Sequence, residues 1–184
     1  MSQNRVSSRA AKQTVRNLVL SLLVTCALAG AVWLVLIPHD DDADPVRPVS
    51  YSQEFTQAGR VAPYTVLAPP LGAPAGVRAT SVRYTPQGEF GPQWHLGFVT
   101  AGEEYIGVEQ SAENPDVFVR RVTFKADRTG TEQVAGAAWE RYEGAKYDAL
   151  VKRDANGVTV VTGTAPMEEL KGMAEALVAS PEQG

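Results

Sequence analysis

The sequence has few of the residue types on which most metal sites and many enzymes depend. Among its 184 residues there is one cysteine, Cys26, and there are two histidines, His39 and His95. A single cysteine forms no intramolecular disulfide, and two distant histidines do not make a histidine-based metal cluster. We therefore expect no metal, no cofactor and no disulfide, and a domain held together by its hydrophobic core alone.

The common catalytic motifs are missing as well. The chain has no Gly-x-Ser-x-Gly elbow, no phosphate-binding Gly-Lys-Ser/Thr loop, no Gly-x-Gly-x-x-Gly and no His-Glu-x-x-His. A Ser-His-Asp triad would have to use His95, whose position on a predicted strand favours a half-buried histidine bonded to a neighbour. The adjacent carboxylates Glu103-Glu104 and Glu168-Glu169 are explained by solubility and by the helix dipole. We predict no catalytic residue, and an enzyme is the less favoured interpretation.

One long stretch lacks charge altogether. Residues 18–37, from Leu18 through Trp33 to Ile37, are twenty residues without a charged side chain. A helix of that length rises about 30 Å, the thickness of the hydrocarbon core of a bilayer. Because lipid offers no partner to free backbone groups, such a segment crosses the membrane only as a helix. We expect a transmembrane helix here.

The charges on either side of this segment predict its orientation. Residues 1–17 contain four basic residues and no acidic one, whereas all 21 acidic residues follow Ile37. By the positive-inside tendency the basic tail is cytoplasmic, and the rest of this single-pass cell-membrane protein is extracytoplasmic. An acidic exported part has no electrostatic attraction for nucleic acid. The expected partners are the lipid bilayer, through residues 18–37, and an envelope protein or small-molecule ligand.

Three alternatives concern the same segment. A secretory signal peptide would be cleaved near Ala27-Leu28-Ala29, but eight more apolar residues, 30–37, follow this site. A lipid-modified Cys26 would need a small residue where Thr25 stands. The small residues Ala27, Gly30 and Ala31 would permit close helix contact in a dimer or with another membrane protein. The oligomeric state is not determined by the sequence.

Residues 38–50 form an acidic, proline-rich linker, and residues 51–181 have the size of one domain. Within the domain, alternating apolar and polar residues predict strands. These are 65–67, 80–84, 93–100, 105–110, 131–134, 137–142, 148–153 and 158–162. Strands 93–100 and 105–110 should form a hairpin. So should 148–153 and 158–162, joined by a turn at Asp154-Ala155-Asn156-Gly157 in which Asn and Gly tolerate positive φ.

Two helices are expected among these strands. Asn114-Pro115 is typical of a helix start, with Asn as the cap, and the helix should continue to Val122. A C-terminal amphipathic helix should begin at the cap Thr164 and place an apolar stripe, Leu170 to Val178, on the sheet. The predicted class is α+β: an N-terminal transmembrane helix, then an antiparallel sheet of about five to seven strands with the C-terminal helix on one face.

Four side chains are candidates for ligand binding. Trp94, His95, Tyr105 and Trp139 lie on predicted strands, and a sheet face with aromatic and polar groups can line a binding site. Alternatively, the aromatic rings are core under the last helix. Strand alternation places Trp94 on one face of its strand and His95 on the other.

Several segments resemble a known protein family. They are Ser81-Val82-Arg83-Tyr84-Thr85-Pro86, Trp94-His95-Leu96-Gly97-Phe98-Val99-Thr100, Tyr105-Ile106-Gly107-Val108-Glu109-Gln110-Ser111, Val134-Ala135-Gly136 with Trp139-Glu140-Arg141, and Val160-Val161-Thr162-Gly163-Thr164-Ala165. The chain resembles an actinobacterial family of single-span membrane proteins, catalogued as a domain of unknown function, number four-two-four-five. The resemblance implies a cell-envelope location and assigns no activity.

The favoured function is a membrane-anchored, extracytoplasmic, non-catalytic module that binds or senses. The alternative is a cell-envelope hydrolase acting on wall or sugar substrates, which would bring two carboxylates together across a cleft. A scaffold that uses the membrane helix to bind another membrane protein is the third hypothesis.

Overall fold

The computed structural model describes residues 21–22, 49–72 and 74–181. The chain divides into two compact units, Met1–Asp44 and Pro45–Gly184. Apart from Ser21 and Leu22, which are helical and exposed, the predicted span at 18–37 lies outside the described residues. Most of the predicted linker, residues 38–48, also lies outside them. Among the residues described, no helix has the length and hydropathy needed to cross a membrane.

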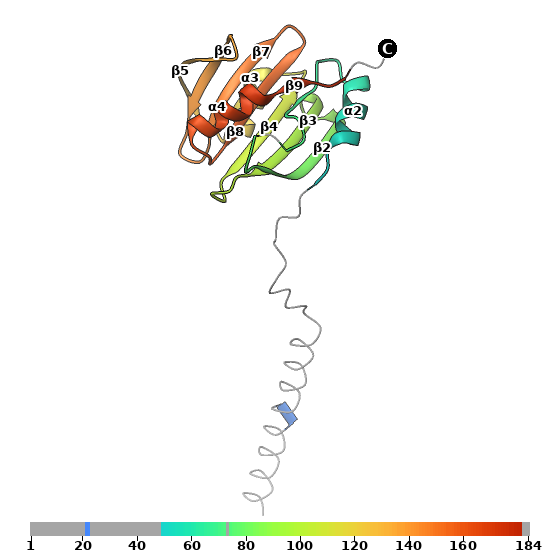
Figure 1. The fold of residues 1–184 in the computed structure, drawn as a ribbon, viewed down its shortest axis with the longest axis vertical. Helices are drawn as coiled ribbons and strands as arrows, with labels where there is room; N and C mark the ends of the chain where they lie inside the picture. The colour runs from blue at the N-terminus through green and yellow to red at the C-terminus, as the bar shows by residue number, and fades with distance from the viewer. Residues whose placement is uncertain (1–20, 23–48, 73, 182–184) are drawn as a thin grey trace, which may run out of the picture. The chain divides into compact units, whose positions relative to one another are not determined.

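The second unit is built on a seven-stranded antiparallel sheet with strand order β2-β3-β4-β8-β7-β6-β5 (Figure 1). Two meanders, β2 to β4 and β5 to β8, meet where β4 pairs with β8. Strands β1 and β9 pair in a second, two-stranded sheet, and Ala68 of β1 belongs to the same core as the large sheet. The strands are β1 (Leu67–Ala68), β2 (Arg78–Gly88), β3 (Gly91–Val99), β4 (Tyr105–Ser111), β5 (Asp127–Val134), β6 (Ala137–Glu143), β7 (Asp148–Asp154), β8 (Gly157–Gly163) and β9 (Val178–Ala179).

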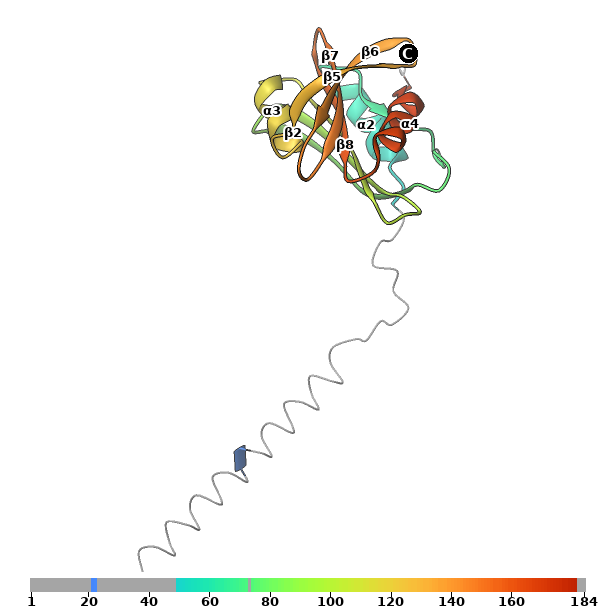
Figure 2. The ribbon, with the colours of Figure 1, turned by 90° about the vertical axis from the view of Figure 1, so that its left-hand side faces the viewer.

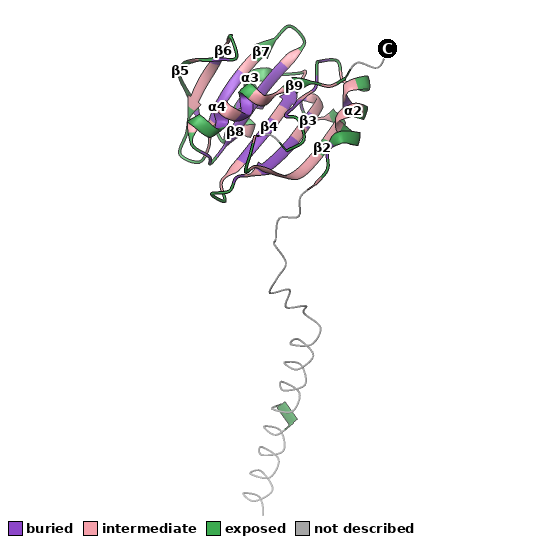
Figure 3. Ribbon diagram, viewed as in Figure 1, coloured by how far each residue is buried: buried purple, intermediate pink, exposed green. Residues whose placement is uncertain are grey.

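Three helices cover the sheet from opposite sides. They are α2 (Ser52–Val61), α3 (Pro115–Val122) and α4 (Met167–Ala176). The edge-on view in Figure 2 shows α3 on one side and α2 and α4 on the other. The central strands are the most deeply buried part (Figure 3). Since α3 is a single short helix, much of its side of the sheet is left without helical cover.

The larger core lies between the sheet and the α2 and α4 side. Its members are apolar side chains that alternate along the strands, together with one face of α4. They include Trp94, Leu96 and Phe98 of β3, Trp139 of β6, and Leu170, Met173 and Ala174 of α4. The C-terminal helix therefore lies across one sheet face, and the predicted α+β class with an antiparallel sheet is confirmed.

The smaller core lies beneath α3. Phe118 and Val119 contact Val151 and Val160 from the opposite face of the same sheet. The Phe90 ring meets the Phe118 ring edge-on, with their centroids 5.5 Å apart. Two cores on the two faces explain why residues 149–151 of β7 and 158–163 of β8 are buried without alternation.

Several local predictions need correction. Residues 52–61 form a helix that was not predicted. Its apolar stripe is short and only Ala58 is fully buried, which is why the pattern was not recognised. Thr164 is not the cap of α4, which begins after Pro166. Asn114 does precede α3, with a left-handed backbone (φ 48°), but its side chain makes no capping hydrogen bond. Val178 lies beyond α4, in β9.

The hairpin turns differ in detail from their prediction. Asp154 pairs with Gly157 at the end of β7 and β8, so the predicted hairpin is confirmed. Neither Asn156 nor Gly157 has the positive φ expected there. Positive φ occurs instead at other turns of this sheet, among them Glu103 (φ 63°) between β3 and β4 and Ala135 (φ 50°) with Gly136 (φ 81°) between β5 and β6.

Candidate functional site

Three neighbouring strands bring a serine, a histidine and a glutamate together on the α3 side of the sheet. Residues Arg83, His95 and Glu109 of β2, β3 and β4 are aligned in register, and Ser81 lies two residues from Arg83 on the same face. Ser81 Oγ lies 2.9 Å from His95 Nε2, and Glu109 Oε1 lies 2.6 Å from His95 Nδ1. The side chains of His95 and Glu109 are 29% and 15% exposed. The network is therefore partly desolvated and open to solvent on one side.

The hydrogen bonds assign a direction to this network. An ionised carboxylate only accepts hydrogen bonds, so Nδ1 of His95 carries the proton that is donated to Glu109. In the neutral imidazole the lone pair is then on Nε2, which accepts from the hydroxyl of Ser81. Ser81 thus donates a hydrogen bond to His95, and His95 donates one to Glu109.

Two glycines make room for a fourth member, Tyr105. Gly97 of β3 and Gly107 of β4 are paired opposite each other, between His95 and the end of the hairpin. A Cβ on Gly107 would lie 2.8 Å from Tyr105 Oη, and one on Gly97 would overlap Ser81 Oγ. The tyrosine ring thus lies flat over the backbone that the glycines leave bare. Ser81, His95, Tyr105 and Glu109 are named the His95 surface below.

The environment of Tyr105 keeps its hydroxyl protonated. Burial raises the pKa of Tyr105 well above its ordinary value, and the nearby Glu109 and Tyr147 add to the effect. Loss of the phenolic proton would place a charge in a desolvated site beside a carboxylate. The hydroxyl is therefore a neutral hydrogen-bond donor across the physiological pH range.

An aromatic row continues from Tyr105. The rings of Tyr105 and Tyr147 stack with centroids 5.8 Å apart, and Phe124 meets Tyr147 edge-on at 4.8 Å. Lys146 Nζ lies 3.6 Å from the Phe124 ring centroid, a cation–π contact. Phe124 is 53% exposed, and both it and Lys125 have positive φ (54° and 68°). Consecutive left-handed residues cost energy, so the surrounding structure holds this exposed ring in place.

The four candidates from the sequence separate into two pairs. Trp94 and Trp139 are 0% and 4% exposed, and Trp94 donates its indole N–H to Leu67 O at 3.0 Å. Both rings belong to the larger core, where no ligand at the surface can reach them. His95 and Tyr105, on the opposite face, are brought together. The structure thus keeps two of the four as surface groups.

Sequence reasoning missed Ser81 and Glu109. A signal for Glu109 existed, because a hairpin in which Val99 pairs with Tyr105 necessarily pairs His95 with Glu109. Ser81 carried no such signal. Its position depends on the irregularity between Ala79 and Ser81, which shifts the register of β2 against β3.

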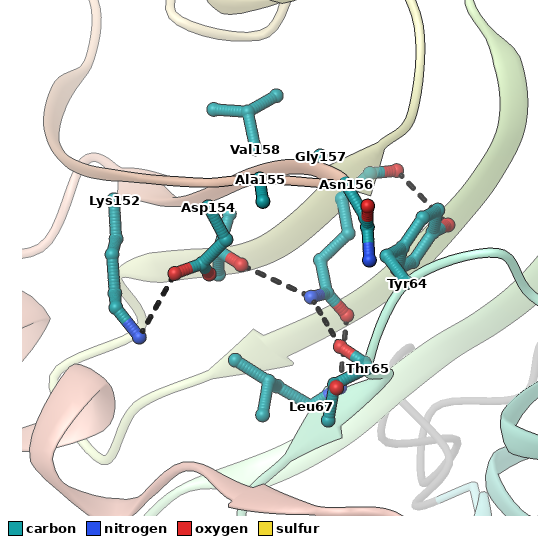
Figure 4. A pocket seen from close by; sticks show the side chains of 11 residues that line it. Tyr64, Thr65, Leu67, Lys152, Asp154, Ala155, Asn156, Gly157 and Val158 are labelled. Carbon is teal, nitrogen blue, oxygen red and sulfur yellow. Dashed lines mark hydrogen bonds and ion pairs between the residues drawn. The ribbon is translucent and has the colours of Figure 1, made fainter.

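A cavity of about 370 Å³ lies at the β7–β8 hairpin, between its turn and the segment that leads into β1 (Figure 4). Its central polar group, the Gln110 amide, donates to Thr65 O and to Thr159 Oγ1, both at 3.0 Å, and accepts from Leu67 N at 2.8 Å. At the rim, Lys152 and Asp154 are paired at 3.5 Å. Because the Gln110 amide and the Lys152–Asp154 pair already bond within the protein, this cavity is better explained as part of the packing, and the His95 surface is the better candidate site.

The carboxylate pairs considered from the sequence do not form a site. Glu103 lies on the exposed turn between β3 and β4, and Glu168 and Glu169 are exposed in the first turn of α4. Across residues 49–72 and 74–181, no three His, Asp, Glu or Cys side chains gather in a way that could hold a metal ion.

Comparison with known proteins places the chain in a family. Residues 10–177 match a family described as a protein of unknown function, DUF4245. The chain belongs to the DUF4245 family. No curated protein gives a significant match.

The match to DUF4245 covers nearly the whole chain, including the predicted span and all of the His95 surface. Membership in DUF4245 assigns no chemistry to any residue. The function has to be argued from the geometry of the site.

Proposed function

We propose that this DUF4245 protein is an extracytoplasmic binding module, anchored in the cell membrane by residues 18–37, and that its ligand contacts the His95 surface. The basic tail is cytoplasmic, residues 38–50 are the spacer, and residues 51–181 face the cell envelope. The ligand is an envelope protein or a small envelope molecule.

The observation that carries the binding role is the composition of an uncovered sheet face. His95 is 29% exposed and holds a hydrogen-bond network, although the same face is apolar under α3. Two glycines clear the space that Tyr105 occupies. Polar groups that are fixed in position by a rigid sheet, beside an aromatic row, are typical of binding sites.

Support for the anchor comes from the sequence. Residues 18–37 carry no charge, four basic residues precede them and the acidic residues follow them. The small residues Ala27, Gly30 and Ala31 lie outside the described residues, so dimerisation through this segment stays a prediction.

Cysteine labelling tests the anchor and its orientation. Cys26 is the only cysteine, so Cys26→Ser gives a background without thiols. In that background Ala145→Cys, on an exposed turn, should react with a membrane-impermeant maleimide on intact cells, and Ser7→Cys should react only after lysis. Equal labelling of both sites, or full-length protein free of the membrane fraction, contradicts the proposal.

Solution NMR tests the binding surface. When residues 45–184 are titrated with soluble cell-wall fragments or with a membrane-protein extract, the shifted resonances should map to His95, Tyr105 and Tyr147. Tyr105→Ala should remove the shifts, whereas Lys171→Ala, on α4 at the opposite face, should leave them. Shifts that map elsewhere, or none with either probe, contradict a ligand site at the His95 surface.

The hydrolase with two converging carboxylates gains no support from the described residues. Glu103-Glu104 lie at the turn between β3 and β4, and Glu168-Glu169 lie at the start of α4. Glu169 lines a cavity of about 290 Å³ beside Thr100, Ala101 and Gly102, but neither Glu103 nor Glu104 lines it with Glu169.

A further inference from the structure

We infer that Ser81, His95 and Glu109 form a nucleophilic triad that cleaves carboxylic esters. This inference rests on the proposed use of the His95 surface as a ligand site and adds a reaction to it. It is independent of the membrane anchor. It also differs from the carboxylate-pair hydrolysis considered from the sequence, because the attacking group is a hydroxyl.

The geometry meets the requirements for an activated serine. A nucleophile and its base must be within about 2.6–3.2 Å, and the base must be oriented by a third group. Ser81 Oγ and His95 Nε2 are 2.9 Å apart, and Glu109 fixes the other ring nitrogen at 2.6 Å. The tautomer set by Glu109 leaves Nε2 free to accept the serine proton. Such triads are recognised by geometry and roles, and their chain order differs between folds.

The site is rigid and can be reached. All three residues lie on strands of one sheet, so their spacing does not depend on a loop. Strand β2 is an edge strand, and the side chains of Ser81 and His95 are only partly buried. A substrate can therefore approach from the solvent side of this sheet face, where His95 is 29% exposed.

A donor for the developing oxyanion is also present. The Tyr105 hydroxyl lies over Gly97 and Gly107, and the Ser81 Oγ lies beside the same Gly97. The raised pKa of Tyr105 keeps its proton available for donation. A donor placed next to the attacking oxygen stabilises the negative charge of a tetrahedral intermediate. One side-chain donor suits esters, because an alcohol is a better leaving group than an amine.

The reaction balances without any added oxidant, reductant or metal. Ser81 Oγ attacks the ester carbonyl carbon while its proton passes to His95 Nε2. The tetrahedral intermediate collapses, His95 returns the proton to the leaving oxygen, and the alcohol departs from an acyl-Ser81 ester. Water then attacks this ester with His95 as base, which releases the acid and restores the serine. The net change is one ester and one water converted to one acid and one alcohol.

The primary test is covalent labelling of the full-length chain in detergent micelles with a fluorophosphonate probe. The Ser81 oxygen displaces fluoride from phosphorus, and peptide mass mapping should find the adduct on Ser81. Ser81→Ala should abolish it. Ser52→Ala, an exposed serine on α2, and His39→Gln, the other histidine, are the matched controls and should label like the native chain. An unlabelled native chain, or an adduct on any residue other than Ser81, overturns the inference.

A second measurement separates catalysis from folding. With p-nitrophenyl acetate as the substrate, His95→Ala should lower kcat by roughly 100-fold or more, and added imidazole should restore part of it. Glu109→Gln is a positioning variant and should lower kcat with little change in KM. Labelling that does not depend on His95, or a loss that imidazole never relieves, overturns the triad. Failure of both tests with intact NMR shifts at His95 would leave the binding role standing and remove only the reaction.

Discussion

Gln110 shows how one buried polar side chain can connect separate parts of the chain. It lies on β4, is 3% exposed, and bonds to the backbone of Thr65 and Leu67 and to the hydroxyl of Thr159. These contacts fasten the irregular segment before β1 to the central strands. Both N–H groups of the Gln110 amide donate hydrogen bonds, and its carbonyl oxygen accepts one.

Replacing this amide should be costly. We expect Gln110→Ala to lower the free energy of unfolding by about 2–4 kcal/mol, because it removes a buried hydrogen bond to the Thr159 hydroxyl and two part-buried ones to the backbone of Thr65 and Leu67. Gln133→Ala, exposed on β5, is the matched control and should change stability by less than about 0.5 kcal/mol. Urea denaturation of residues 45–184 measures both. Equal effects of the two substitutions would show that the amide bonds contribute little.

Buried tyrosines should limit stability at high pH. Burial raises the pKa of Tyr64, whose hydroxyl donates to Pro92 O at 3.2 Å, and that of Tyr105. In the unfolded chain these phenols ionise at their ordinary pKa of 10.0. The folded state therefore binds these two protons more tightly than the unfolded state. Their contribution to the free energy of unfolding is fully present below pH 10 and is lost as the pH rises above it. Urea midpoints between pH 8 and pH 11.5 should fall, and the double variant Tyr64→Phe, Tyr105→Phe should show a flatter decline. An unchanged slope would exclude these two groups as the cause.

At the scale of elements, the fold is two meanders joined through β4 and β8. The alternation in β3 predicted its faces correctly, since Trp94 is core and His95 is at the opposite surface. The hairpins were predicted because adjacent strands with short turns pair locally. Helix α2 was missed because it is short and mostly polar: its apolar residues, Phe55, Ala58 and Val61, keep helical spacing but are only three among ten.

Two glycine-to-alanine substitutions should change the free energy of unfolding in opposite directions. Gly172 lies within α4, where an added Cβ would meet no atom within 4 Å. Gly172→Ala should raise the free energy of unfolding by about 0.5–1 kcal/mol, because alanine loses less backbone entropy in a helix. Gly163, at the end of β8, would place its Cβ against the Tyr105 carbonyl oxygen, so Gly163→Ala should destabilise. Thermal melts of both variants decide this, and melts that shift in the same direction would contradict it.

At the scale of the whole molecule, residues 45–184 are a unit with its own cores. The larger core lies under α2 and α4, the smaller one under α3, and both are made of residues from 51 onward. A single antiparallel sheet serves both cores, so its unfolding should be cooperative.

This independence can be measured directly. A chain starting at Pro45 should unfold in one urea transition, and the midpoint should match that of the same unit in the full-length chain in detergent. Intrinsic tryptophan fluorescence is a suitable probe, because Trp94 and Trp139 are both buried in the larger core. A shorter chain that unfolds without cooperativity, or at a clearly lower midpoint, would show that residues 1–44 are needed for folding.

The sequence by itself determined the α+β class, most strand positions and the two faces of β3, because those depend on composition and on the period of two along a strand. It also determined the family. The pairing of His95 with Glu109 follows from the predicted hairpin. Only the tertiary structure decided that Ser81 meets His95, because this contact depends on the pairing of β2 with β3 and on the register irregularity in β2. The packing of the helices also decided that Trp94 and Trp139 are buried and that His95 is partly exposed to solvent. Helices α2 and α4 cover one face of the sheet, whereas α3 covers only part of the other. Register and coverage arise from contacts between segments far apart in the chain, which local patterns do not encode.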